Sequence, residues 1–367
     1  MSWGSWADTR RERIRAAGQW RAPRDLDGAG PEGKLGPHGT PVVSFASNDY
    51  LGLTQHPEVV AAAHAALDRW GAGSGAARLV VGSRPIHSEL EAALADWKHA
   101  EAAVLFPTGF AANLGALTTL GGTDVLICSD ELNHASIIDG CRMSRAEVAV
   151  YRHRDLDHLD ALLARRGSRR ALVVTDTVFS MDGDVAPVDE MLEVCRRHGA
   201  MAILDEAHAV LGPDPDLDGV DAVRVGTLSK TLGSLGGFVA GPLPFTELLV
   251  NKARPYIFTT ASTPADAAAA LAALRVVRSP EGDRLRAQLR RHVDALRPDH
   301  PSPIIPVILG DEEAALAASA RLLEEGLFVP AIRPPTVAPG TSRLRIALSA
   351  AHTNAHVDRL VGALEGL

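Results

Sequence analysis

One stretch decides the fold: residues 171–208, with the sequence ALVVTDTVFSMDGDVAPVDEMLEVCRRHGAMAILDEAH. Two short apolar runs, Ala171–Val174 and Met201–Leu204, each end at polar residues, as strands buried on both faces of a sheet do. Between them, the segment 188–195 has apolar residues at positions i, i+3, i+4 and i+7, with a proline before it and Gly199 soon after it. This strand–helix–strand unit predicts an α/β fold whose sheet is mostly parallel.

Similar elements lie on both sides of this unit. Val125–Cys128 and Val223–Val225 are two further candidate strands, and the Ala-rich segment 265–278 predicts a long helix. The C-terminal part combines expected helices near 284–297 and 313–325 with expected strands near 304–309 and 343–348. These patterns indicate a large α/β domain followed by a smaller α+β domain.

The N-terminal part differs from the rest in composition. Residues 7–17 have helical composition, and the following segment is rich in glycine and proline, which predicts a loop-rich arm. We therefore expect an N-terminal arm over residues 1–47, a large domain over 48–282 and a small C-terminal domain over 283–367.

Composition and charge exclude several classes of protein. Of the 367 residues, 46% are apolar and 22% charged, and the net charge of −8 gives no bulk attraction to nucleic acid or to anionic lipid. The stretch 261–274 is too short and too interrupted to span a membrane, and the polar N-terminus has no secretory leader pattern. The cysteines, Cys128, Cys141 and Cys195, are too scattered for a disulfide framework or a zinc site. We expect a soluble cytoplasmic protein that binds neither nucleic acid nor membranes and no metal.

Polar residues that follow strands of a parallel sheet mark the edge where such sheets bind ligands. One of them, Lys230, lies in GTLSKTLGSLGG (226–237), just past a candidate strand. A lysine in a glycine-rich loop can approach an aldehyde without bulky neighbours, and the hydroxyls of Thr227 and Ser229 can bind a phosphate. The loop does not match the phosphate-binding loop of nucleotide-binding proteins, and a lysine in a loop is by itself more often a surface charge.

Three other segments strengthen this interpretation. Asp205 in LDEAH (204–208) suits the partner of a pyridinium nitrogen, and His208 suits a donor to the phenolate oxygen of such a ring. In FPTGFAAN (106–113), Gly109 and Phe110 open a predicted helix, whose free N–H groups can bind phosphate. His134 follows a strand end and could stack on a flat ring, although a single histidine is more often structural.

Together these motifs resemble the α-oxoamine synthases, enzymes of fold type I that depend on pyridoxal 5'-phosphate (PLP). The resemblance is colinear from about Arg11 to the C-terminus. Besides the motifs above, it rests on SNDYLGL (47–53), GSGAARLVVGSRPIHSELE (73–91), DELNHASIIDG (130–140), DTVFSMDGD (176–184) and IRPPTVAPGTSRLRIALSAAH (332–352). It implies the PLP-dependent transferase fold of type I and a homodimer with the active site at the interface.

The resemblance also implies roles for individual residues. Lys230 would form the covalent link to PLP and later move the α-proton, while Asp205, His208 and His134 serve the ring as described above. The remaining cofactor contacts would be Gly109, Phe110, Ser180, Thr227, Ser229 and, from the neighbouring subunit, Thr260. The expected substrate-binding residues are Arg21, Asn48, His134, Arg333, Thr336 and Arg345.

The C-terminal motifs IRPPTV and GTSRLRI are similar to those of the family member that serves biotin biosynthesis. We therefore expect an acyltransferase that joins L-alanine to a pimeloyl thioester with loss of CO2. The alternatives are a sister enzyme that joins glycine to acetyl-CoA or succinyl-CoA, and a PLP-binding protein without synthase activity. The sequence does not distinguish coenzyme A from a carrier protein as the acyl carrier.

The chain departs from the family pattern in three places. Asp176 stands where the family usually has glutamate, and residues 209–212 (AVLG) replace the usual Gly-Thr-Gly. The segment from 212 to 223 is also shorter than usual. All of the expected cofactor ligands are retained, so we expect an active enzyme.

Overall fold

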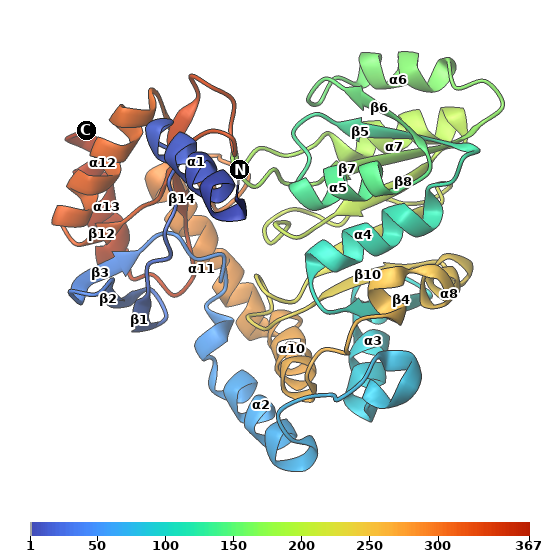
Figure 1. The fold of residues 1–367 in the computed structure, drawn as a ribbon. Helices are drawn as coiled ribbons and strands as arrows, with labels where there is room; N and C mark the ends of the chain where they lie inside the picture. Colours follow the sequence, from blue (N-terminus) through green and yellow to red (C-terminus); the bar gives the residue numbers. More distant parts are fainter. Residues whose placement is uncertain (1) are drawn as a thin grey trace. The chain divides into compact units, whose positions relative to one another are not determined.

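The computed structural model describes residues 2–367, which form two compact units (Figure 1). The larger unit consists of Asn48–Pro303 and Ser349–Ala351. The smaller unit consists of the chain up to Ser47 together with Ile304–Leu348 and His352–Leu367. Residues 283–303, which the sequence analysis assigns to the small domain, belong to the larger unit, and the domain limits at 48 and 283 stay a prediction.

A seven-stranded sheet forms the centre of the larger unit. β10 is antiparallel to both of its neighbours, and the other pairs are parallel, so the prediction of a mostly parallel α/β sheet is confirmed. Of the six strands expected from sequence, the four between residues 125 and 225 belong to this sheet, and those near 304–309 and 343–348 are strands of the smaller unit. In spatial order the strands are β4 (Ala102–Phe106), β10 (Gly237–Gly241), β9 (Ala222–Thr227), β8 (Met201–Asp205), β7 (Arg170–Asp176), β5 (Val125–Asp130) and β6 (Glu147–Tyr151).

Helices cover both faces of this sheet (Figure 1). Along β7, Leu172 and Val174 pack into the core on one face, while Val173 packs into the core on the other, which explains the continuous apolar run. One face carries α4 (Gly109–Leu120), α5 (Ala135–Met143), α8 (Leu243–Lys252) and α9 (Arg254–Ile257); the other carries α6 (Leu156–Ala164) and α7 (Val188–His198).

The helix α7 follows the signals in its sequence. Pro187 precedes it, acidic residues occupy its first turn, basic residues occupy its last turn, and Gly199 ends it in the left-handed conformation with φ 57°. This arrangement matches the helix dipole at both ends and fixes the strand–helix–strand unit that places β7 beside β8.

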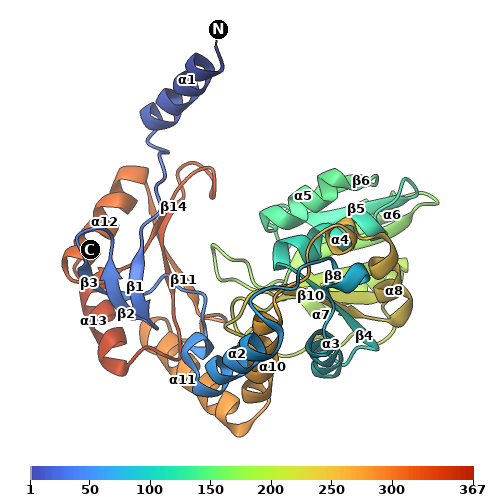
Figure 2. The ribbon, with the colours of Figure 1, turned by 60° about the horizontal axis from the view of Figure 1, so that its bottom comes forward.

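The larger unit has further helices, of which α3 packs against β4 at the edge of the sheet. The expected Ala-rich helix is present as α10, whose residues are almost all buried and which packs against α2 and α3 (Figure 2). The elements are η1 (Leu53–Gln55), α2 (Pro57–Trp70), η2 (Arg78–Gly82), α3 (Pro85–Trp97), α10 (Pro264–Val277) and α11 (Pro280–Leu296).

The smaller unit has two sheets with the orders β1-β2-β3-β12 and β11-β14-β13. The prediction of a loop-rich arm was wrong for residues 26–44, because the glycines there form the tight turns of an antiparallel meander. Gly30, Gly36 and Gly39 all have positive φ values, and each lies between two strands. The strands are β1 (Leu26–Ala29), β2 (Glu32–Leu35), β3 (Thr40–Ser44), β11 (Ile304–Gly310), β12 (Leu327–Phe328), β13 (Ala331–Ile332) and β14 (Ser342–Ala347).

Three helices complete this unit: α1 (Trp3–Ala16), α12 (Glu312–Glu324) and α13 (Asn354–Glu365). The helix α1 has no buried residue and projects from the rest of its unit (Figure 2). No helix within residues 2–367 is both long enough and apolar enough to cross a lipid bilayer.

Candidate active site

A cavity of about 180 Å³ lies where the carboxyl ends of the strands of the larger unit meet. It gathers residues from β7, β8, β9 and the N-termini of α4 and α5. Eight residues expected from the sequence line it: Gly109, Phe110, His134, Asp205, His208, Thr227, Ser229 and Lys230. Thr108, Asn113, Ser136, Asp176, Ala207, Gly226 and Leu235 complete the lining.

The lysine of the glycine-rich loop reaches into this cavity. Lys230 follows β9, and its Nζ lies 2.9 Å from Nε2 of His208. On its other side, Nδ1 of His208 lies 2.5 Å from the hydroxyl oxygen of Tyr50. His208 therefore connects the amine of the cavity with a buried phenol.

A chain of hydrogen bonds holds Asp205 and His134. Nδ2 of Asn113 donates to Oδ2 of Asp205 at 2.6 Å and to Oγ of Ser136 at 2.9 Å. Oγ of Ser136 lies 2.7 Å from Nδ1 of His134, and the backbone N–H of Ala207 donates to Oδ1 of Asp205 at 2.9 Å. Because Ser136 accepts from Asn113, its own hydroxyl is available to donate to Nδ1, which leaves the hydrogen of a neutral His134 on Nε2. Burial lowers the pKa of His134, which favours that neutral ring.

Asp176 lies next to Asp205 in the sheet, because the two residues are direct partners in the register of β7 and β8. Burial and the nearby carboxylate of Asp205 raise the pKa of Asp176 well above its usual range. Oδ2 of Asp176 accepts the backbone N–H of His134 at 2.6 Å. This bond holds the loop that carries His134.

The opposite end of the cavity is built to hold an anion. The helix α4 begins at Gly109, so the first N–H groups of the helix have no partner within it and its positive dipole end faces the cavity. The hydroxyls of Thr227 and Ser229 lie 2.7 Å apart, and a Cβ on Gly109 would come within 3.3 Å of the Thr227 side chain. Gly237 is required as well, because a Cβ there would lie 2.5 Å from the backbone nitrogen of Gly109. The glycines thus allow β9, β10 and the start of α4 to meet closely.

Seven of the residues expected at the cofactor or substrate do not line this cavity, and three of them belong to the larger unit. Ser180 lies in the loop after β7. Asn48 accepts a hydrogen bond from the hydroxyl of Tyr50 at 3.2 Å through its Oδ1. Thr260 is exposed and forms an isolated antiparallel bridge with Ala77.

The other four expected substrate residues belong to the smaller unit. Arg345 is buried on β14, whereas Arg21 and Thr336 are exposed. Arg333 donates from Nη1 to the carbonyl oxygen of Gly18 at 2.6 Å, which ties the arm that carries Arg21 to the loop after β13. Their roles in binding stay predictions.

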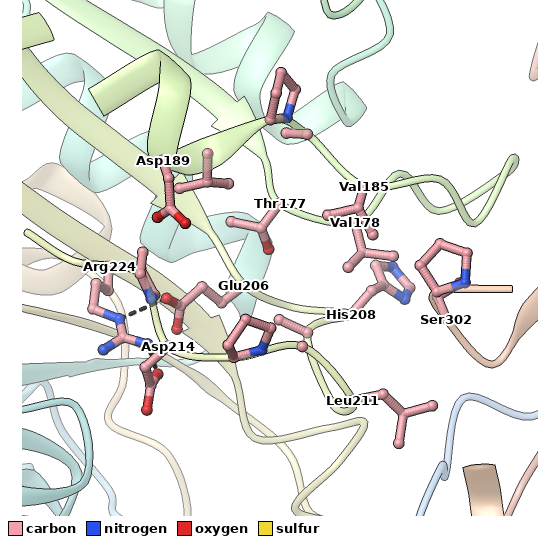
Figure 3. Close-up of a pocket in the computed structure, with 18 of the residues that line it drawn as sticks. Thr177, Val178, Val185, Asp189, Glu206, His208, Leu211, Asp214, Arg224 and Ser302 are labelled. Carbon is pink, nitrogen blue, oxygen red and sulfur yellow. Dashed lines mark hydrogen bonds and ion pairs between the residues drawn. The ribbon is translucent and has the colours of Figure 1, made fainter. Parts of the chain in front are cut away.

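A second cavity, of about 220 Å³, also has His208 in its lining (Figure 3). Half of its lining residues are aliphatic or proline, and a buried ion network lies at one side. Glu206 lies 2.5 Å from Nε of Arg224 and 2.7 Å from Nζ of Lys98, and Arg224 also contacts Asp214. The network joins the strands β8 and β9 to the end of α3 and to the shortened loop after His208.

No three His, Cys, Asp or Glu side chains within residues 2–367 are grouped so that they could hold a metal ion. The three cysteines are free and buried.

The class of protein follows from comparison of this fold and site with known proteins. The profile of the aminotransferase class I and II family matches residues 40–364. A serine palmitoyltransferase from S. paucimobilis, solved with PLP and myriocin, superimposes with a TM-score of 0.91 at 32% identity, covering 98% of this chain and 96% of that one. The chain belongs to the aminotransferase class I and II family, and its cofactor is PLP.

Relatives with similar sequences narrow the class of protein further. The chain is 51% identical to the 8-amino-7-oxononanoate synthase of Anaeromyxobacter dehalogenans, covering 98% of this chain and 94% of the relative. It is 52% identical to that of a Methylobacterium species, covering 89% and 87%. The solved 8-amino-7-oxononanoate synthase of Francisella tularensis has a TM-score of 0.73 at 27% identity, covering 88% and 96%. The resemblance to the α-oxoamine synthases and the fold of type I are confirmed.

The residues of the cavity fit PLP group by group. The start of α4 with Thr227 and Ser229 suits the phosphate, and Asp205 suits the ring nitrogen. Lys230 provides an amine for the aldehyde, and His208 beside it suits the phenolate oxygen.

Proposed function

We propose that this chain is an 8-amino-7-oxononanoate synthase, a PLP-dependent acyltransferase of biotin biosynthesis. It joins Cα of L-alanine to the carbonyl carbon of a pimeloyl thioester. The alanine carboxylate leaves as CO2, and the C–S bond breaks so that the free thiol of the carrier departs. The observation that carries this proposal is the cavity that brings Lys230, Asp205, His134 and His208 together, in a chain 51% identical to such a synthase over nearly its full length.

We assign the steps near the cofactor to four residues. PLP, when bound, supplies an aldehyde that takes up the amino group of alanine and a ring that withdraws electrons from its Cα atom. Lys230 would hold the aldehyde before the substrate arrives and would then move the Cα proton at its Nζ. Asp205 holds a proton on the ring nitrogen through its charge, since Asn113 and Ala207 fix both of its oxygens. His134 would lie against the ring face, and His208 would donate to the phenolate oxygen.

The remaining cofactor and substrate contacts are also part of the proposal. Ser180 would contact the phenolate side of the ring, and Asn48 would lie near the cofactor. Arg345 pairs with the alanine carboxylate, because a planar guanidinium can bind a carboxylate with two bonds. Arg21, Arg333 and Thr336 bind the distal carboxylate of the pimeloyl chain, which an acetyl group lacks. The bond from Arg333 to Gly18 supports this grouping within the smaller unit, because it holds the arm that carries Arg21.

We propose a homodimer in which Thr260 of the partner subunit completes the phosphate site. Support comes from the exposed apolar side chains of Leu79, Val80, Val81 and Phe258, which are more than half exposed and belong to segments near the Ala77–Thr260 bridge. Lys230→Ala and Thr260→Glu subunits should each be defective alone, while a mixed dimer regains one intact site. A fully active monomer at working dilution would contradict the proposal.

We further propose a cytoplasmic location, which the three free, buried thiols support.

Product analysis tests the reaction. Alanine and glycine are each offered with pimeloyl-CoA, a pimeloyl carrier protein, acetyl-CoA and succinyl-CoA, with Lys230→Ala as the inactive control. We expect 8-amino-7-oxononanoate from alanine with a pimeloyl thioester, and a much higher kcat/KM than for glycine with acetyl-CoA. Faster turnover of glycine with acetyl-CoA would assign the chain to a sister synthase, and PLP binding without any product would indicate a non-catalytic protein.

A further inference from the structure

Tyr50 is fully buried, and its phenol meets a residue of the active-site cavity that lies 158 positions further along the chain. Its hydroxyl oxygen lies 2.5 Å from Nδ1 of His208 and 3.2 Å from Oδ1 of Asn48. The backbone of Tyr50 is held at both ends, since its N–H donates to the carbonyl of Asn48 and its carbonyl accepts the N–H of Ala350. The phenol therefore has a fixed position beside the imidazole.

The contacts of His208 limit where its ring hydrogen can be. When Nζ of Lys230 carries three hydrogens, it can only donate, so Nε2 of His208 must accept across the 2.9 Å contact. The ring hydrogen of a neutral His208 is then on Nδ1 and is donated to the oxygen of Tyr50. Tyr50 in turn donates its own hydrogen to Oδ1 of Asn48. In this state the three hydrogen bonds run in one direction, from Lys230 through His208 and Tyr50 to Asn48.

The opposite state keeps the contact between Tyr50 and His208, but the hydroxyl hydrogen of Tyr50 turns from Oδ1 of Asn48 to Nδ1 of His208. When His208 donates from Nε2, for example to a phenolate oxygen, Nδ1 becomes an acceptor and Tyr50 donates its hydrogen to it. A hydroxyl can donate or accept while its oxygen stays in place, because only its hydrogen rotates. A carboxylate can only accept, and an ammonium group can only donate. Both hydrogen positions of the His208 ring therefore keep a short, buried hydrogen bond to Tyr50.

We propose that Tyr50 is a positioning residue that sets the ring tautomer of His208 and lets it reverse during turnover. This inference rests on the roles of Lys230 and His208 in the proposed function. His208 has to accept from a cationic Lys230 at one stage and donate to the phenolate oxygen of PLP at another. Tyr50 keeps Nδ1 of His208 hydrogen-bonded in both stages, once as the acceptor and once as the donor.

The experiment uses Tyr50→Phe as holoenzyme and follows the visible absorbance of the bound cofactor against pH. Tyr151→Phe is the matched control, because Tyr151 is also buried but lies at the end of β6 and does not line the cavity. Without the Tyr50 hydroxyl, the form of His208 that donates from Nε2 loses its support, and the phenolate oxygen becomes a stronger base. The midpoint of the titration should rise by about one pH unit in Tyr50→Phe, a tenfold change in the proton equilibrium, and stay unchanged in Tyr151→Phe.

A purely structural role would lower the melting temperature without moving this midpoint. An unchanged midpoint in a folded, PLP-loaded Tyr50→Phe protein would therefore overturn the inference. If Tyr50→Phe does not fold, 3,5-difluorotyrosine at position 50 keeps the shape, and its more acidic phenol should move the midpoint downward; no shift would again overturn the inference. The proposed function is judged separately, because the wild-type product assay does not depend on these variants.

Discussion

The backbone N–H of His134 donates a 2.6 Å hydrogen bond to Oδ2 of Asp176. Asp176 ends β7 directly beside Asp205, the last residue of β8, and Asn133 adds a second bond by accepting the N–H of Asp176 at 2.9 Å. Asp176, which stands where the family usually has the longer glutamate, thus fixes the loop that carries His134. Its location beside a second carboxyl also has an electrostatic cost, because burial and Asp205 raise the pKa of Asp176.

Two substitutions separate these effects of Asp176 in the cofactor-free protein. Asp176→Asn keeps an acceptor for the His134 N–H and removes the buried charge. Because the folded pKa of Asp176 lies above its unfolded value, the charge opposes folding increasingly as pH rises, so the stability of Asp176→Asn relative to wild type should increase from pH 5.5 to pH 8. Asp176→Ala leaves the N–H unpaired and should lower the free energy of unfolding by about 1–3 kcal/mol. Thermal unfolding at both pH values measures this, and equal behaviour of the two variants would contradict it.

Much of the fold could be predicted because buried parallel strands and capped helices leave strong local patterns. The strand ends then place Asp205 and Lys230 at one edge of the sheet by topology alone. The meander of residues 26–44 was missed because all four residues of β1 are exposed and show no alternation of apolar and polar residues.

The support of the site was harder to predict, because it depends on contacts between distant segments. Asn113 lies in FPTGFAAN (106–113) and Ser136 in DELNHASIIDG (130–140). Only folding brings Asn113 to Asp205, which is 92 positions away in the chain. Tyr50 likewise lies in SNDYLGL, where the sequence alone points only to Asn48. A polar residue at a helix start or in a turn has many local explanations, and no pattern in the sequence distinguishes them.

Asp205→Asn should reduce turnover far more than cofactor binding. The neutral amide cannot hold a proton on the ring nitrogen, and loss of such an electrostatic interaction costs several kcal/mol, on the order of 10²-fold or more in kcat. The fold should tolerate the change, because a flip of the Asn113 amide presents its Oδ1, for which residues 2–367 provide no hydrogen-bond partner. Steady-state kinetics and a PLP titration test this, and near-normal turnover would remove Asp205 from its assigned role.

His153 links two strand-end loops of the larger unit. Burial alone would lower its pKa, but hydrogen bonds to Asp130 and Asp184 at 3.0 and 2.8 Å outweigh this and raise the pKa to about 9. Because this folded pKa lies above the unfolded value of about 6.5, the stabilisation is complete below pH 6.5 and is lost as pH rises through about 9.

We expect His153→Gln to lower the free energy of unfolding by about 1–2 kcal/mol at pH 6, after allowance for solvent screening, and by much less at pH 10. Urea unfolding across this pH range measures the difference. His64→Gln, at an exposed site on α2, is the control and should show no such trend. A loss that is the same at all pH values would mean that the charge of His153 does not hold the loops.

The last prediction concerns the buried network beside the second cavity. Glu206 pairs with both Lys98 and Arg224, and the side chains of Lys98 and Glu206 are only 7% and 4% exposed. Glu206→Gln should lower the free energy of unfolding by about 3 kcal/mol, because it leaves Lys98 as a buried cation without its counter-charge, whereas Arg224 keeps Asp214. Adding Lys98→Met removes that cation, so the double variant should regain part of the loss. A cycle of the two single variants and the double variant in urea should therefore give a coupling energy above about 1 kcal/mol. The exposed pair Arg142–Asp139 is the matched control, and its coupling energy should be less than about 0.5 kcal/mol. If the effects of the Lys98 and Glu206 substitutions are also additive, the network does not act as a unit.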